Sequence, residues 1–519
     1  MISKLNSVTL LGLSCQKIDV EIAVTKGLNS FQIVGLPDNI ISESRERIKI
    51  AFKSSSIDFP RGKITVNLAP SHLRKEGSAF DLPIALGIIA LKTDIKIDLS
   101  EVLVVGELSL NGELRSVKGI LSIVEYAKEE GYKSILIPKQ NEKEACLIDG
   151  IEIYAYKSLD EVYTHITGNM NKTSSPKTDV KSFFTDKEVV DLDMSFIKGQ
   201  DIAKRALMIA AAGGHNIVMV GSPGSGKTLL GKAFKDILPR MNKKEMLEVT
   251  RIYSISGLLK QGVPIIVKRP FRVVHHSASP ASIIGGGRLA KPGEISLANR
   301  GAIMFDEFAE FPQSVLENLR QPMEDRTITV SRVSGTLTYP AQFILLASMN
   351  PCKCGYYGVK ESKKICTCTQ SDVSKYQKKI SGPIYDRFDL FISVNPVKVE
   401  ELTNKSKKYG MKSSEIRDIV EKARLIQDDR FKNLNISFNS EMSIMELKNI
   451  CSLSEGCLSL LKKAILNLGL TARAYHRIIK VSRTIADIEG AKSIQDNHIL
   501  EALQYRKGSN EKFFEKIYF

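Results

Sequence analysis

The sequence contains no tryptophan, no internal repeat and no apolar run long enough to cross a membrane. Its best apolar stretch, about residues 79–91, is short and includes Asp81 and Pro83. The N-terminus also lacks a basic region followed by an apolar segment, so we expect no secretory signal. Together these absences argue against a membrane protein and predict a cytoplasmic one with no membrane partner.

Cysteine is scarce, with 8 residues in 519, yet four of them fall close together. They form the pattern C-x-C-x11-C-x-C at Cys352, Cys354, Cys366 and Cys368. In a reducing compartment such a cluster favours metal over disulfides, and two close pairs of thiolates suit a structural, tetrahedral Zn²⁺ site. The usual spacing is C-x2-C, so free thiols or redox chemistry stay open as alternatives. The remaining cysteines show no grouping and are expected to be packing residues.

Acidic residues are outnumbered, 58 against 74 basic residues, which gives a net charge of +16 and a pI near 9.2. This excess favours a polyanionic partner, with nucleic acid first, although lysine-rich surfaces can also serve only solubility. Hydrophobic content of 43% and charged content of 25% are those of an ordinary globular protein. The length predicts two to four domains.

One segment matches the phosphate-loop pattern G-x-x-x-x-G-K-[ST] in full. Its residues are Gly221, Ser222, Pro223, Gly224, Ser225, Gly226, Lys227 and Thr228. An apolar run at 216–220 precedes it and a helix-like pattern at 229–238 follows, a context that disfavours a chance glycine-rich turn. We therefore expect ATP and Mg²⁺ as cofactors, with Lys227 on the β- and γ-phosphates and Thr228 on the metal ion.

Two further apolar strands end in polar residues that complete an ATPase site. Residues 302–305 lead into Asp306, predicted to hold the Mg²⁺ shell, and Glu307, predicted to orient and polarise the attacking water. Residues 342–349 lead into Asn350, whose amide can hydrogen-bond the water or the γ-phosphate. An acidic pair or a single asparagine at a strand end is common. An ATPase role is favoured because these residues follow a phosphate loop in the order that such a site requires.

Strands alternate with helices in this region, which predicts an α/β core with a parallel sheet between helices and ligands at the carboxyl ends of the strands. We place an N-terminal α+β domain at 1–168, a polar linker at 169–190, the ATPase core with the cysteine cluster at 191–397 and a helical lid at 398–519.

Two arginines are candidates for neutralising charge on the transferred phosphoryl group. Arg387 lies between two acids in SGPIYDRFDLF, and Arg473 lies in the basic segment LTARAYHRIIKVSRTIAD. A local ion pair of Arg387 with Asp386 or Asp389 is an equally open interpretation.

Long motifs carry a specific resemblance over nearly the whole chain. The stretches FRVVHHSASPASIIGGGRLAKPGEISLANRGAIMFDEF, SGPIYDRFDL and TARAYHRIIKVSRTIADIEG resemble magnesium-chelatase-like AAA+ ATPases, and closely the YifB/ComM family. The resemblance implies Walker A at 221–228, Walker B at Asp306 and Glu307, sensor 1 at Asn350, an arginine finger at Arg387 and sensor 2 at Arg473. It also implies a ring, expected to be a hexamer, with nucleotide at subunit interfaces.

Residues 328–340 read as two strands around a Ser-Gly turn, and 275–287 contain another insertion typical of these proteins. In related helicases such a hairpin touches DNA in the ring channel, which makes Arg332 a candidate phosphate contact. A hairpin that only packs against its neighbour is the alternative.

The N-terminal segment resembles the proteolytic domain of Lon but lacks its catalytic pair. In an ungapped match the serine position falls on Ala79 and the lysine position on Leu121. Ser78 and Lys118 lie nearby, but such offsets redirect a side chain on a regular element. We expect an inactive Lon-like fold used for assembly or binding.

The sequence therefore predicts a ring-forming, ATP-driven motor on single-stranded or branched DNA, a helicase or branch-migration enzyme in recombination and natural transformation. A chelatase-type ATPase that remodels a partner protein, and an unfoldase with a degenerate protease module, remain alternatives.

Overall fold

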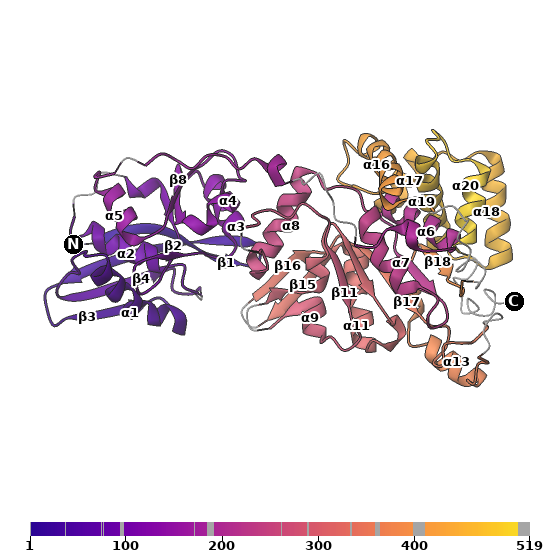
Figure 1. Ribbon diagram of the computed structural model, residues 1–519, viewed down its shortest axis with the longest axis horizontal. Coiled ribbons are helices and arrows are strands. Elements are labelled where there is room, and N and C mark those ends of the chain that lie inside the picture. The colour runs from indigo at the N-terminus through magenta and orange to yellow at the C-terminus, as the bar shows by residue number, and fades with distance from the viewer. Residues whose placement is uncertain are drawn as a thin grey trace. The chain divides into compact units, whose positions relative to one another are not determined.

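The computed structural model describes residues 2–506 except 37, 74, 76, 94–97, 171, 184–190, 261, 288–289, 333–334, 359–363 and 398–409. These residues form two compact units (Figure 1). The first contains residues 1–185 and 246–266, and the second contains 186–245 and 267–519. No helix among the described residues is both long enough and apolar enough to cross a membrane.

The first unit is built on a mixed seven-stranded sheet with the order β3-β4-β2-β1-β5-β8-β9. Its strands are β1 (Ile2–Leu11), β2 (Ser14–Thr25), β3 (Ser30–Val34), β4 (Lys63–Ala69), β5 (Val102–Val104), β8 (Ser134–Pro138) and β9 (Glu152–Tyr156), beside a short pair, β6 (Glu107–Leu108) and β7 (Leu114–Arg115). The β1–β2 and β2–β4 pairs are antiparallel, and the other neighbours in this sheet are parallel.

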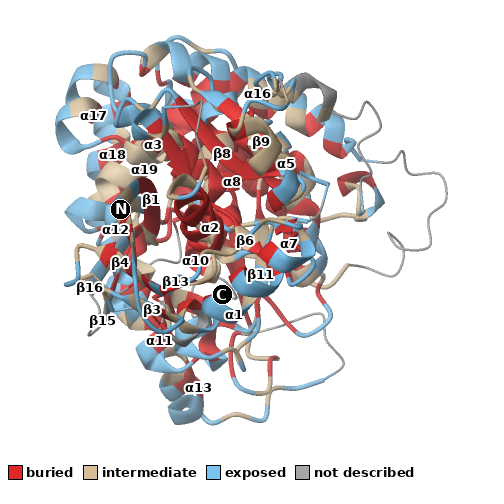
Figure 2. Ribbon diagram, turned by 90° about the vertical axis from the view of Figure 1, so that its left-hand side faces the viewer, coloured by how far each residue is buried: buried red, intermediate tan, exposed pale blue. Residues whose placement is uncertain are grey.

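Helices cover both faces of this sheet. Successive strand residues point to opposite sides, so apolar residues of one strand pack against helices on both faces. The helices are α1 (Asn39–Ser54), α2 (Asp81–Ala90), α3 (Ile120–Glu129), α4 (Glu142–Ala145) and α5 (Leu159–Ile166). In β5, Val102 and Val104 pack in a core with α1, α2 and α5, whereas Leu103 packs in a second core with α3 and α4. Helix α2 is buried over residues 81–89, which explains the apolar stretch in the sequence (Figure 2).

Most of α8 (Lys243–Ser256) belongs to the first unit, although the sequence placed residues 246–266 in the ATPase core. Ser254 Oγ donates a 2.5 Å hydrogen bond to Glu144 Oε1 in α4. Arg251 forms an ion pair with Glu125 in α3. Since these contacts join positions more than a hundred residues apart, the local pattern around 246–266 gives no indication of them.

The second unit contains a five-stranded, wholly parallel sheet with the order β11-β14-β17-β10-β18. Its strands are β10 (Ile217–Val220), β11 (Phe271–Val274), β14 (Ala302–Phe305), β17 (Ile344–Met349) and β18 (Leu390–Ser393). The helices around it are α6 (Asp201–Gly213), α7 (Lys227–Phe234), α9 (Pro280–Ile284), α10 (Glu294–Leu297), α11 (Gln313–Asn318), α12 (Arg320–Asp325), α13 (Gln370–Gln377) and α14 (Gly382–Tyr385). The short strands β12 (Gly285–Gly286) and β13 (Lys291–Pro292) pair with each other.

A helical region completes the second unit, as predicted for the lid. It consists of α16 (Ser413–Arg430), α17 (Ile444–Ile450), α18 (Glu455–Leu468), α19 (Ala472–Ile488) and α20 (Asp496–Gln504). The side chains of Ser454 and Thr471 cap α18 and α19 by accepting hydrogen bonds from backbone N–H groups of the first turn. Buried residues of these helices share one hydrophobic core with α6 and β10. The predicted α/β class with a helical C-terminal region is confirmed.

The predicted hairpin at 328–340 forms as β15 (Thr327–Arg332) and β16 (Gly335–Pro340), in antiparallel register from Thr327↔Pro340 to Arg332↔Gly335. Its base is anchored because the Tyr339 hydroxyl donates a 2.8 Å hydrogen bond to the carbonyl of Ala290. The turn and the side chain of Arg332 lie outside the described residues, so its role at DNA stays a prediction.

Candidate functional site: an ATPase centre at the carboxyl edge of the parallel sheet

The phosphate loop joins β10, which lies between β17 and β18, to the first residue of α7. Gly224 and Gly226 have φ of +77° and +96°, in the left-handed region that favours glycine. A Cβ on either glycine would meet no atom within 4 Å, so the backbone there faces open space. Backbone N–H groups at a helix N-terminus in front of open space are suited to binding phosphate oxygens.

Two other features of the loop fit a polyphosphate. A Cβ on Gly221 would lie 2.2 Å from the carbonyl oxygen of Val394, so only glycine allows this close packing at the start of the loop. The Ser225 hydroxyl is buried and has no hydrogen-bond partner among the described residues. A buried hydroxyl without a partner is costly, and a phosphate oxygen would satisfy it.

Lys227 is 8% exposed and lies across the loop. Its Nζ donates to the carbonyl oxygens of Gly221 (2.7 Å) and Ser222 (2.8 Å) and to Asn350 Oδ1 (3.3 Å). Burial lowers the pKa of Lys227 to about 8, against the opposing influence of Asp306 and Glu307. Phosphates would supply the negative charge that favours the protonated amine.

Asp306 follows β14 directly and lies opposite the loop. Its Oδ2 accepts a 2.9 Å hydrogen bond from Thr228 Oγ1, and its Oδ1 accepts one from Ser348 at the end of β17. A hydroxyl and a carboxylate at this distance provide the oxygen ligands that Mg²⁺ prefers. The structure thus brings together the residues that the sequence predicted for the metal ion.

Glu307 adopts a left-handed backbone conformation, with φ of +56°. Its Oε2 lies 3.1 Å from Nδ1 of His276, a residue that sequence reasoning did not include in the site. The parallel register pairs Val274 with Phe305, so two residues beyond each strand His276 and Glu307 come side by side. The sequence did not predict the contact between His276 and Glu307 because local motifs do not show that β11 and β14 are neighbours in the sheet.

The two candidate arginines lie away from the phosphate loop. The carbonyl of Arg387 accepts a 3.2 Å hydrogen bond from Asn216, the residue before β10, which places Arg387 at the amino edge of the sheet. The phosphate loop begins at the other end of β10, and four strand residues span about 13 Å. In one subunit, then, Arg387 and the loop occupy opposite edges.

Glu324 in α12 is the carboxylate that the two arginines share. Arg387 is 7% exposed and forms an ion pair with Glu324, while its Nε and Nη1 donate to the carbonyls of Arg320 (3.1 Å) and Pro383 (2.7 Å). Arg473 Nη2 lies 4.0 Å from the same carboxylate, and its side chain is 61% exposed. The local partner of Arg387 is therefore neither of the acids considered from the sequence.

Asp389, one of those acids, has partners of its own. It forms an ion pair with Arg477 in α19, and its Oδ2 lies 3.4 Å from Nδ1 of His215. Although burial opposes this, Arg477 and His215 hold the pKa of Asp389 well below its usual range. The ion pair of Asp389 with Arg477 thus connects the lid helix α19 to the sheet. Glu324, and not Asp389, is the counter-ion of Arg387.

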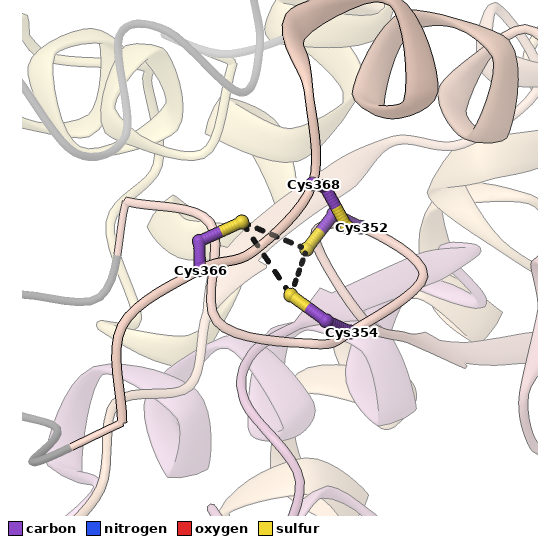
Figure 3. Close-up of side chains that lie close together, drawn as sticks. All are labelled: Cys352, Cys354, Cys366 and Cys368. Carbon is purple, nitrogen blue, oxygen red and sulfur yellow. Dashed lines mark hydrogen bonds between the residues drawn. The ribbon is translucent and has the colours of Figure 1, made fainter.

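The four clustered cysteines converge in the loop after β17 (Figure 3). The Sγ atoms of Cys352, Cys354 and Cys366 lie 3.3 to 3.7 Å apart, and all four sulfurs lie within 4.8 Å of one another. Tetrahedral zinc with Zn–S bonds of about 2.3 Å requires sulfurs about 3.8 Å apart. The spacing fits a Cys₄ zinc site, and none of the eight cysteines forms a disulfide.

The cysteine loop also contacts the phosphate loop. A Cβ on Gly355 would lie 2.5 Å from Cδ of Pro223, so Gly355 packs directly against the phosphate loop. Gln377 Nε2 in α13 donates a 3.1 Å hydrogen bond to the carbonyl of Pro351. Ordering of this loop by a metal ion would therefore support the loop that binds phosphates.

We expect Cys354→Ser to remove bound zinc and to weaken ATP binding severalfold, because the loop behind Pro223 loses its cross-link. Cys15→Ser, outside the cluster, serves as the control. Zinc content by mass spectrometry of the native protein and ATP affinity by titration measure both effects. Full zinc content in the Cys354→Ser variant would show that the cluster is not the zinc site.

In the first unit, the positions matched to the Lon catalytic pair form no such site. Leu121 is 2% exposed in α3, and the carbonyl of Ala79 accepts a 2.9 Å hydrogen bond from Gly106 N. The Ser78 hydroxyl donates to Glu107. The interpretation of this unit as a module without the serine–lysine chemistry stays a prediction.

Comparison with protein families and curated proteins agrees with this geometry. The profile described as magnesium chelatase, subunit ChlI, matches residues 193–402, a ChlI profile matches 20–141 and a ChlI C-terminal profile matches 410–506. The chain is 38% identical over 499 residues to competence protein ComM of Haemophilus influenzae, covering 96% of both chains. It is 37% identical to uncharacterized protein YifB of Escherichia coli, covering 96% of this chain and 95% of YifB.

A shorter match, 30% identical over 184 residues, is to Lon protease 2 of Bacillus subtilis and covers 33% of this chain and 32% of that protein. The fold, the strand-end site and these profiles define a magnesium-chelatase-like AAA+ protein. Within that class, the chain belongs to the ComM/YifB family.

Proposed function

We propose that this chain is the subunit of a ring, a hexamer, that hydrolyses ATP with Mg²⁺ and uses the energy to move on DNA in the cytoplasm. The observation that carries the proposal is the division of the site between two edges of one sheet. The phosphate-binding residues lie at the carboxyl edge, whereas Arg387 lies at the amino edge. A complete site then needs the arginine of a neighbouring subunit.

When bound, ATP with Mg²⁺ supplies the phosphoryl group that is transferred to water. Lys227 binds the β- and γ-phosphate oxygens, exchanging its contacts with the carbonyls of Gly221 and Ser222 for them. Thr228 and Asp306, which are hydrogen-bonded to each other, would hold the metal ion. Glu307 orients and polarises the attacking water, and Asn350 fixes its position beside Lys227. Such sites act by positioning and charge neutralisation.

The substrate is proposed to be single-stranded or branched DNA. A net charge of +16 favours a polyanion, and the β15–β16 hairpin offers an element that can enter a ring channel. The Haemophilus influenzae relative is named as a competence protein, which supports a role in recombination during uptake of foreign DNA. A chelatase-type ATPase acting on a partner protein is the second candidate, favoured by the ChlI profiles.

Defined single-stranded and forked DNA should raise the rate of ATP hydrolysis, and binding should weaken steeply with salt and show no sequence preference. Arg332→Ala should lower the slope of log affinity against log salt by about one unit. Lys53→Ala, an exposed cation in the first unit, should leave the slope unchanged. Fluorescence anisotropy over a salt series measures this. No DNA binding at low salt with ATP present would instead support the chelatase-type candidate.

A further inference from the structure

A pair of histidines and a glutamate lie close together just beyond the ends of two neighbouring strands. Strands β11 and β14 are parallel and end in register at Val274 and Phe305. His275 and His276 follow β11 directly, and Glu307 is the second residue after β14. The carboxyl edge of the sheet therefore presents two imidazoles beside the carboxylate.

The three side chains are already close together. His276 Nδ1 lies 3.1 Å from Glu307 Oε2, and the two imidazole rings have centroids 4.1 Å apart. One donor atom from each residue can be chosen so that all three lie within 4.8 Å of one another. His275 and Glu307 are exposed and His276 is half-buried, so an ion could reach the group from solvent.

We propose that His275, His276 and Glu307 bind a divalent transition-metal ion, Zn²⁺ in the first instance, and that this ion stops ATP hydrolysis. Two imidazoles and a carboxylate form a common three-residue zinc donor set that leaves a fourth position for water. Imidazole also selects zinc over magnesium, which prefers oxygen ligands. The site is thus chemically distinct from the magnesium position between Thr228 and Asp306.

The inhibitory effect rests on the proposed function, whereas metal binding does not. A carboxylate that ligates zinc cannot polarise a water molecule for attack, so the ion and hydrolysis compete for Glu307. The Cys₄ cluster is a separate group of ligands, and its four thiolates would close around an ion of their own. Two classes of zinc site per chain are therefore expected, with the histidine site the weaker and more accessible.

The test starts from native protein whose zinc content has been measured, and Zn²⁺ is then titrated calorimetrically without nucleotide. Wild type is expected to bind one further equivalent, and His275→Ala to bind it about tenfold more weakly or worse because one of three protein ligands is lost. Glu307→Gln should also weaken it. His72→Ala, an exposed histidine outside the site, is the matched control. No further equivalent in wild type, or equal affinity in His275→Ala, overturns the site.

Hydrolysis is measured separately at buffered free Zn²⁺, with each rate divided by the rate of the same variant without zinc. The relative rate of wild type and His72→Ala should fall as the further equivalent binds, and His275→Ala should require about tenfold more zinc. Inhibition at identical zinc concentrations in all three proteins would refute the competition for Glu307. If wild type hydrolyses no ATP with Mg²⁺ alone, the proposed function fails while the calorimetric result still decides the metal site.

Discussion

Exchanging Glu307 for glutamine should leave ATP bound and reduce kcat by about 10²- to 10⁴-fold, the usual contribution of a group that takes part in proton transfer. The amide has nearly the same shape but cannot polarise water as the carboxylate does. Because Glu307 does not belong to the phosphate loop, ATP affinity should change little. Phosphate release measures kcat, and equilibrium titration with a fluorescent ATP analogue measures binding.

Lys227→Ala provides the contrasting result, loss of nucleotide binding itself. Lys227 is buried across the loop and carries the charge that meets the phosphates. Lys232→Ala, an exposed lysine on the same helix, is the matched control and should behave as wild type.

Turnover at the wild-type rate in the Glu307→Gln variant would show that Glu307 has no role in hydrolysis.

The carboxyl-edge part of the site could be predicted from the sequence because its residues come after buried strands, Asp306 and Asn350 directly and Thr228 at the end of the phosphate loop. Thr228, Asp306 and Asn350 need only the rule that parallel strands end at the same edge of a sheet. Their contacts through Lys227 and Thr228 agree with that expectation. The cysteine group likewise follows from spacing within a single loop.

The contacts that the sequence did not predict depended on pairings between distant segments. Glu324 lies 63 positions before its partner Arg387, and nothing in SGPIYDRFDLF points to it. The contact of His276 with Glu307 required the order and register of β11 and β14. The same limit explains why 246–266 was assigned to the core, since the side chains that hold α8 lie in α3 and α4.

Arg387→Ala should assemble with ATP and lose about 10³-fold or more in hydrolysis rate, the effect expected of an arginine that neutralises transferring phosphoryl charge. Arg387 cannot serve its own subunit because β10 separates it from the phosphate loop. Its side chain is held by Glu324, Arg320 and Pro383, and a phosphate from a neighbour would compete with Glu324. Arg45→Ala, an exposed arginine in the first unit, is the control.

Mixing the inactive Arg387→Ala and Lys227→Ala proteins distinguishes action between subunits from a local ion pair. The first keeps an intact phosphate loop and the second keeps an intact arginine, so some interfaces in a mixed ring contain both halves of the site. Hydrolysis should then reappear, passing through a maximum as the ratio of the two proteins is varied. A local ion pair with Glu324 would give no such recovery, because each subunit would retain its own defect whatever its neighbour. Wild-type turnover by Arg387→Ala alone would assign the residue to that local role.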